Sequence, residues 1–231
     1  MTSADLIAAA ISNRQKRLEQ VTALRPLAKE SRQRAESLRT AENAVKDTGR
    51  RAEFVRSMHH VPGFFPTPPA VVDKMIEAAG VAGCPSLRIL EPSCGKGNIA
   101  HPLTRLGHMV YCVEVVPALA EYCRKDGLHV QCADFLGLTL HDFSFAEGVG
   151  GFDHVLMNPP FECRQDENHI RHAFGFLRPG GQLVAVCSST TALRLADWVY
   201  GRGRIEPLLP GAFKSSERPT GVNVSLVIIN N

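Results

Sequence analysis

Four short apolar runs in this 231-residue sequence each lead into a polar side chain. The runs and the residues that follow or end them are 87–90 with Glu91, 108–113 with Glu114, 129–133 with Asp134, and 152–157 with Asn158. Segments rich in helix formers separate the runs. Because strands that alternate with helices build a parallel sheet, the carboxyl ends of such strands meet at one edge, where ligands bind. We therefore expect the four polar side chains to lie close together.

The same alternation continues to the end of the sequence. Further strands are expected at 182–188, 205–209 and 222–229, and helices at 70–79, from about 98, at 117–125 and at 167–177. A turn at 178–181 and a surface loop at 210–216 are expected between them. The sequence thus predicts an α/β domain over residues 59–231: a Rossmann-like, seven-stranded, mostly parallel sheet with helices on both faces.

Residues 1–58 differ in composition and are expected to form a separate N-terminal helical arm. They contain 12 Lys or Arg against 7 Asp or Glu, whereas the rest of the chain has 14 against 16. One interpretation is a solvated helical hairpin, or helices that pair in a homodimer. The other is a basic arm (residues 14–56) that lies on nucleic acid phosphates. Its contacts would be Arg14, Lys16, Arg17, Arg32, Arg34, Arg39, Arg50 and Arg51.

The seven cysteines argue for a reducing compartment. Their number is odd and none forms a Cys-x-x-Cys pair, so neither a disulfide framework nor a structural zinc site is indicated, and no metal is expected. The sequence has no signal-peptide pattern at its start and no apolar run near the ~20 residues that span a bilayer. A soluble, cytoplasmic protein without membrane contact is expected.

The first strand ends in a glycine-containing loop that is typical of ligand sites. Residues 91–97 read Glu-Pro-Ser-Cys-Gly-Lys-Gly, and the two glycines permit left-handed torsions and close approach of a ligand. The third glycine of a dinucleotide fingerprint is absent, which disfavours a nicotinamide oxidoreductase. Lys96 is not followed by Ser or Thr, so the P-loop signature is absent too.

The fourth strand leads directly into Asn-Pro-Pro-Phe at 158–161. The prolines cannot continue a central strand, so an amide, a stiff carbonyl and an aromatic ring gather at the strand end. Taken alone, the segment is equally a proline-rich turn. Upstream, Phe-Pro-Thr-Pro at 65–68 is expected to be extended, and Thr67 either caps the following helix or offers its hydroxyl to a ligand.

In this order the segments resemble those of the amino-methylating class I S-adenosylmethionine-dependent methyltransferases, with gamma-like motif order and a compact phage or plasmid type. The resemblance covers about residues 60–231 and implies S-adenosyl-L-methionine as cofactor. In the family, residues matching Glu114 bind the ribose and those matching Asp134 and Phe135 hold the adenine. The cofactor-binding residues that it implies are Phe65, Thr67, Glu91, Pro92, Ser93, Gly95, Gly97, Glu114, Asp134, Phe135 and Asn158. The catalytic residues that it implies are Asn158, Pro159, Pro160 and Phe161.

The resemblance further implies methyl transfer to the exocyclic amine of adenine in DNA. The Asn158 oxygen and the Pro159 carbonyl would accept hydrogen bonds from the amine while Phe161 stacks on the base. A target-recognition domain is expected after the last strand in this group, and the sequence leaves no room for one. Specificity would then be low, or would come from the basic arm or a partner. The alternatives are adenine in RNA, a protein glutamine amide, and a non-catalytic binding subunit.

Overall fold

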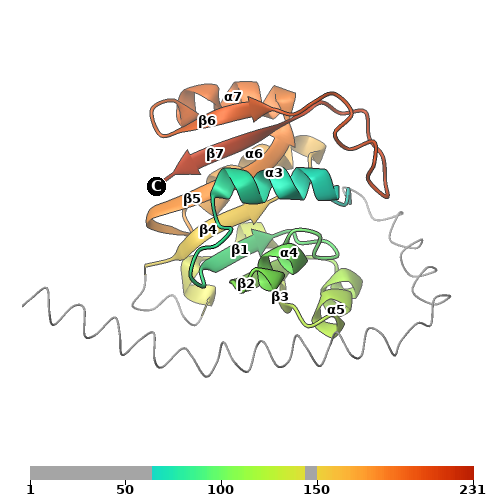
Figure 1. Ribbon diagram of the computed structural model, residues 1–231, viewed down its shortest axis with the longest axis vertical. Coiled ribbons are helices and arrows are strands. Elements are labelled where there is room, and N and C mark those ends of the chain that lie inside the picture. Colours follow the sequence, from blue (N-terminus) through green and yellow to red (C-terminus); the bar gives the residue numbers. More distant parts are fainter. Residues whose placement is uncertain (1–63, 144–149) are drawn as a thin grey trace, which may run out of the picture. The chain divides into compact units, whose positions relative to one another are not determined.

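The computed structural model describes residues 64–143 and 150–231 (Figure 1). The predicted N-terminal arm, its basic contacts and its pairing helices lie outside these residues. One seven-stranded sheet forms the centre of the described part, in the order β3-β2-β1-β4-β5-β7-β6. The strands are β1 (Arg88–Pro92), β2 (Met109–Glu114), β3 (His129–Cys132), β4 (Phe152–Met157), β5 (Leu177–Ser188), β6 (Gly203–Pro207) and β7 (Val224–Asn230).

The sheet is mostly parallel, as predicted. Strands β1 to β5 pair in parallel, whereas β7 runs antiparallel to both of its neighbours, β5 and β6. The four strands β3, β2, β1 and β4 are consecutive in the sheet. Their carboxyl ends therefore share one edge, and this arrangement brings the predicted polar side chains together.

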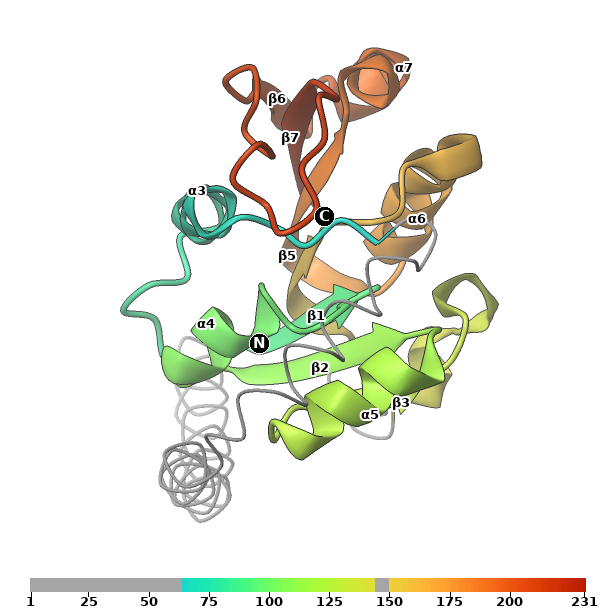
Figure 2. The ribbon, with the colours of Figure 1, turned by 90° about the vertical axis from the view of Figure 1, so that its right-hand side faces the viewer.

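Helices cover both faces of the sheet. They are α3 (Pro69–Ala79), α4 (Ala100–Arg105), α5 (Pro117–Lys125), α6 (Gln165–Phe174) and α7 (Ser189–Val199), with short 3-10 turns η1 (Phe135–Gly137), η2 (Leu140–Asp142) and η3 (Glu162–Arg164). Residues of α3, α4 and α5 join one buried cluster and those of α6 and α7 the other; Figure 2 shows α3 and α6 on opposite sides. Successive strand residues point to opposite faces of the sheet, so Ile89 belongs to the cluster with α3, α4 and α5 and Leu90 to the cluster with α6 and α7.

Most predicted element boundaries agree with the structure within about two residues, but the end of α6 and the start of β5 do not, and helix α7 was not among the predicted helices. Helix α6 ends at Phe174 rather than near 177, and β5 begins at Leu177 and continues through 178–181, where a turn was expected. The expected turn is an irregularity within β5, because the register shifts after the pairing of Leu177 with Phe152. Gly181 lies here against the backbone, and a Cβ on it would come within 3.0 Å of the Phe152 carbonyl oxygen. Gly181 therefore allows close strand approach instead of ending the strand.

The predicted surface loop at 210–216 is only partly exposed. Phe213 is fully buried in the cluster that includes α3, and Ser216 is buried as well. The composition of the loop did not predict this burial, because a single aromatic residue, Phe213, anchors the loop. The loop is therefore anchored in the core by Phe213 and Ser216.

Three further observations concern the described residues. No helix among them is long and apolar enough to cross a membrane. The seven cysteines, all of which lie in this part, form no disulfide. In the same ranges, no group of three or more His, Cys, Asp or Glu side chains is arranged to hold a metal ion.

Candidate active site

A cavity of about 300 Å³ opens at the carboxyl edge of β1, β2, β3 and β4. This volume lies at the lower end of the range for small-molecule sites. Most of the predicted site residues line it: Phe65, Thr67, Glu91, Ser93, Gly95, Glu114, Asp134, Phe135, Asn158, Pro159, Pro160 and Phe161. Pro92 and Gly97 do not. Segments that are far apart in the sequence thus form one pocket.

The loop after β1 is built from strained and left-handed backbone. Ser93, Gly95 and Gly97 have φ angles of 60°, 58° and 78°. A positive φ is uncommon for a residue with a side chain, and such strain is concentrated at functional sites. Gly97 serves packing rather than ligand contact, because a Cβ on it would lie 2.5 Å from Leu128.

Glu91 is a buried carboxylate at the base of the cavity. It is 2% exposed, and its Oε2 has no hydrogen-bond partner in the described part of the chain. Burial raises the pKa of Glu91 well above its ordinary value, Glu114 raises it further, and the N–H groups of Ala100 and Ile99 oppose the shift. A cationic ligand group on Oε2 would satisfy the orphaned oxygen and favour the ionised form.

Glu114 holds the loop in place. Its Oε2 accepts from Gly95 N at 2.8 Å and its Oε1 from Val116 N at 2.9 Å. Burial nevertheless raises the pKa of Glu114, against the effect of these N–H donors. Each carboxylate oxygen retains a second lone pair, so a ligand hydroxyl can still be bound.

The next pair of predicted cofactor residues, Asp134 and Phe135, lies on the cavity wall. Asp134 Oδ1 accepts from Leu136 N at 3.0 Å and starts the turn η1 on the cavity wall. The ring of Phe135 borders the cavity but is 2% exposed and packs at 5.1 Å from Phe176. Phe135 therefore contributes an edge of the core instead of a freely accessible face.

The amide of Asn158 is oriented by the segment that precedes α3. Its Nδ2 donates to Phe65 O and to Thr67 Oγ1, both at 3.0 Å. Its Oδ1 is buried and, among the described residues, has no partner. Thr67 does not cap α3, whose N-cap is Pro68 without a side-chain bond. The amide oxygen is thus a buried, unpaired acceptor on a residue of the cavity wall. An unpaired buried acceptor costs ~1–3 kcal/mol unless a donor fills it.

Directly after the motif the chain reverses in a strained turn. Phe161 is half-buried, and its ring lies 6.5 Å from that of Phe213. Cys163 and Arg164 follow with φ angles of 51° and 61°. Two consecutive left-handed residues with side chains are costly, which points to a conformation that the site requires. The reversal places the first turn of α6 beside the cavity.

Helix α6 contributes two cavity residues that were not predicted, Gln165 and His169. His169 is buried, and its Nδ1 lies 3.3 Å from Ser93 Oγ. Burial lowers the pKa of His169 to about 4, with Asp134 acting in the opposite direction. The ring is therefore neutral near pH 7. Nothing in the sequence marks it, because only the reversal after Phe161 turns this helical face to the cavity.

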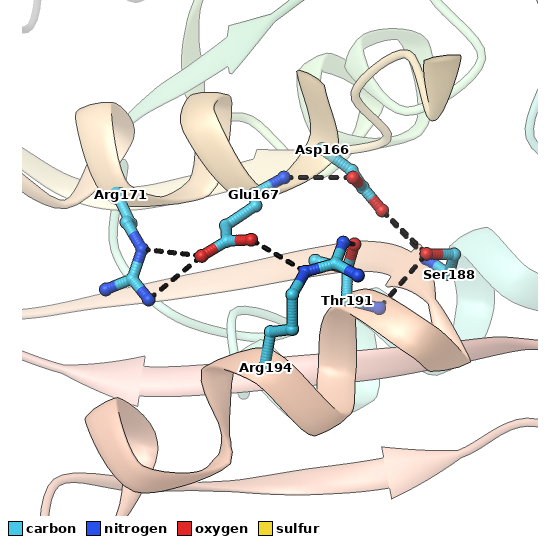
Figure 3. Close-up of polar contacts among 6 residues, drawn as sticks. All are labelled: Asp166, Glu167, Arg171, Ser188, Thr191 and Arg194. Atoms are coloured by element: carbon cyan, nitrogen blue, oxygen red, sulfur yellow. Dashed lines mark hydrogen bonds and ion pairs between the residues drawn. The ribbon is translucent and has the colours of Figure 1, made fainter. Parts of the chain in front are cut away.

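A polar network fixes α6 against the rest of the domain (Figure 3). Asp166 is fully buried, and its Oδ2 accepts from Ser188 N at 3.1 Å and Ser188 Oγ at 3.0 Å. The neighbouring Glu167 accepts from Arg194 Nε on α7 at 2.8 Å. A buried carboxylate is tolerated only with such partners. The network holds the helix, and with it His169, in a defined position.

The fold is that of the class I methyltransferases. Residues 90–185 match the family model described as a methyltransferase domain. Two solved structures share the fold: a dimethyladenosine transferase from Plasmodium falciparum (TM-score 0.54, 19% identity, covering 73% of this chain and 64% of that chain) and the magnesium protoporphyrin IX methyltransferase from Synechocystis, solved with bound SAM (0.52, 12%, 71% and 79%). At these identities they establish the fold alone.

Sequence relatives point to a different substrate from the one predicted. A ubiquinone biosynthesis O-methyltransferase from Xanthomonas oryzae pv. oryzae is 31% identical over 125 residues, which is 53% of this chain and 52% of the relative. The chain spans about half the length of the curated relatives it matches. Related proteins in other Xanthomonas species carry the same name at 31–32% identity.

The prediction of adenine methylation in DNA is therefore wrong, since the named relatives are O-methyltransferases of ubiquinone biosynthesis. The physical reason lies in the acceptor. An amide oxygen such as that of Asn158 accepts a hydrogen bond from an O–H as well as from an N–H. The motif therefore predicts where a substrate donor binds but does not identify the atom that is methylated.

Proposed function

We propose that this protein transfers a methyl group from S-adenosyl-L-methionine to a hydroxyl group on a small planar substrate. The proposal is supported by the methyltransferase fold, by the family match over residues 90–185 and by relatives named as O-methyltransferases. The observation that carries the binding position of the acceptor group is the buried oxygen of Asn158, which has no partner among the described residues and belongs to a residue of the cavity wall. The choice of a hydroxyl over an amine is supported by the named relatives.

S-adenosyl-L-methionine is the methyl donor of this fold class, and the cavity has side chains that suit it. When bound, it supplies a methyl group on a positively charged sulfur and also carries an ammonium group. The three carboxylates Glu91, Glu114 and Asp134 border the cavity and favour a cationic ligand. Of these, Glu91 is best placed for the ammonium, because no donor from residues 64–143 or 150–231 reaches its buried Oε2.

The substrate hydroxyl is bound by the side chain of Asn158. Asn158 Oδ1 accepts the O–H, and its direction is set because Nδ2 is bonded to Phe65 and Thr67. The half-buried ring of Phe161 and the flat face of Pro160 suit a planar substrate. Such positioning of a nucleophile in a fixed direction is the main contribution that this type of site makes to the rate.

Methylation of a hydroxyl releases a proton, and His169 is the neutral base on the cavity wall. The methyl group would leave the sulfonium sulfur for the substrate oxygen, so that S-adenosylhomocysteine remains as the neutral thioether. The O–H proton would pass to the ring of His169 and then to solvent. Ser93 Oγ, which lies 3.3 Å from Nδ1, fixes the orientation of the ring. Because burial lowers the pKa of His169 to about 4, the ring is neutral at pH 7 and would hold the proton only while passing it to solvent.

The test is methyl transfer from isotope-labelled S-adenosyl-L-methionine to a panel of acceptors. Catechol carries two O–H donors on a benzene ring, and ortho-phenylenediamine carries two amino groups at the same positions. Duplex DNA, single-stranded DNA and RNA complete the panel. We expect label on the catechol oxygen. The variant Asn158→Ala should lower the rate by about 10²–10³, whereas Asn168→Ala, an exposed amide on α6, should not. Label on the diamine or a nucleic acid alone would refute O-methylation.

A further inference from the structure

The 208–223 loop between β6 and β7 contacts three separate pieces of the cavity wall. Glu217 forms an ion pair with Lys96 on the loop after β1. The ring of Phe213 lies 6.5 Å from that of Phe161. Ser216 and Arg218 contact residues 64–66, the beginning of the segment that orients Asn158. None of these loop residues lines the cavity itself, so any effect on it is indirect.

Ser216 makes the shortest of the hydrogen bonds to the segment. Its Oγ donates to Pro66 O at 2.6 Å in a buried position and accepts from Arg218 N at 3.3 Å. Pro66 lies between the two residues whose oxygens receive the Asn158 amide, Phe65 and Thr67. A displacement of Pro66 would therefore move both acceptors.

Arg218 holds the same segment one residue earlier. Its guanidinium donates to Phe64 O at 3.2 Å and lies 4.7 Å from the centre of the Phe65 ring. The planar fork of arginine permits a hydrogen bond and a stacking contact together, which lysine does not reproduce. Arg218 and Ser216 thus secure the backbone on either side of Phe65.

We propose that Ser216 and Arg218 are positioning residues for Asn158. They act through residues 64–67: they fix Phe65 O and Thr67 Oγ1, which bind both protons of the Asn158 amide and direct its oxygen to the substrate. The inference rests on the proposed function, in which that oxygen binds the acceptor hydroxyl. It assigns to a loop outside the cavity the alignment of the group that holds the substrate.

The test follows the side-chain amide of Asn158 directly. In ¹⁵N-labelled protein its Nδ2 resonance is assigned by its loss in Asn158→Asp, and the hydrogen-exchange rate of its protons is measured in the variants. Ser216→Ala should speed exchange by about tenfold, since one buried hydrogen bond of the segment is lost. Ser215→Ala, an exposed neighbour, is the matched control and should leave the rate unchanged.

Methyl transfer to catechol is measured on the same samples. For Ser216→Ala we expect kcat to fall about tenfold, while the Kd for S-adenosylhomocysteine changes less than threefold. Arg218→Lys supplies a second, independent variant and should show the same pattern if Ser216→Ala does not fold. A fall in kcat with unchanged exchange at Asn158 would overturn the positioning role. Faster exchange with no transfer to catechol even by the unaltered protein would instead reject the proposed function and leave the positioning role intact.

Discussion

The burial of His169 predicts a loss of stability in mild acid. An ordinary histidine has a pKa of about 6.5, whereas burial lowers that of His169 to about 4. Between these values the unfolded chain binds a proton that the folded chain excludes. Stability must therefore decrease as the pH falls from 6.5 toward 4, and it must rise with pH in this window.

The magnitude follows from the two pKa values. At pH 5 the unfolded residue is almost fully protonated and the folded residue almost not. The free energy of unfolding therefore falls by about 2 kcal/mol relative to pH 7.5. His169 is only 6% exposed, so solvent screening reduces this little. Burial also lowers the pKa of His154 to about 4, so the experiment must cancel the contribution of His154 to the pH dependence of stability.

The assay compares the unaltered protein with His169→Gln by urea unfolding at pH 7.5 and pH 5. Because His154 is present in both proteins, the difference between them isolates His169. The unaltered protein should lose about 2 kcal/mol more than the variant over this interval. His141→Gln, an exposed site on η2, serves as the control and should behave like the unaltered protein. A difference between the protein and His169→Gln that is independent of pH would refute the reasoning.

The remaining predictions concern the site and the core. His169→Gln should lower kcat for catechol about a hundredfold at pH 7.5 with little change in KM, measured by initial rates; an unchanged kcat would exclude His169 as the base. Glu91→Gln should weaken S-adenosylhomocysteine binding about tenfold by calorimetry, because a hydrogen bond to a charged group is lost; unaltered affinity would place the ammonium elsewhere. Phe213→Ala should reduce the free energy of unfolding by about 3–5 kcal/mol, since the side chain is fully buried. A loss below 1 kcal/mol in chemical denaturation would contradict its role as the anchor of the 208–223 loop.

Local sequence pattern was sufficient for most of the fold. Helix α5 occupies 117–125 as predicted, because Pro117 at its start and an apolar face mark it clearly. Helix α3 ends at Gly80, which takes the left-handed conformation that glycine permits. The start of β5 was misplaced, because Gly181, which allows a close strand approach, is typical of a turn when the neighbouring strand is unknown.

By itself, the sequence determined which residues end the strands and so which carboxylates and amide meet at one edge, since short apolar periods and turn residues are local signals. Only the tertiary structure decided that Thr67 orients Asn158 instead of capping α3, that His169 faces the cavity, and that Ser216 holds Pro66 from 150 residues away. These contacts join segments remote in the chain, and no local preference encodes them. The methylated atom was not encoded either, because an amide oxygen accepts a hydrogen bond from nitrogen and oxygen alike.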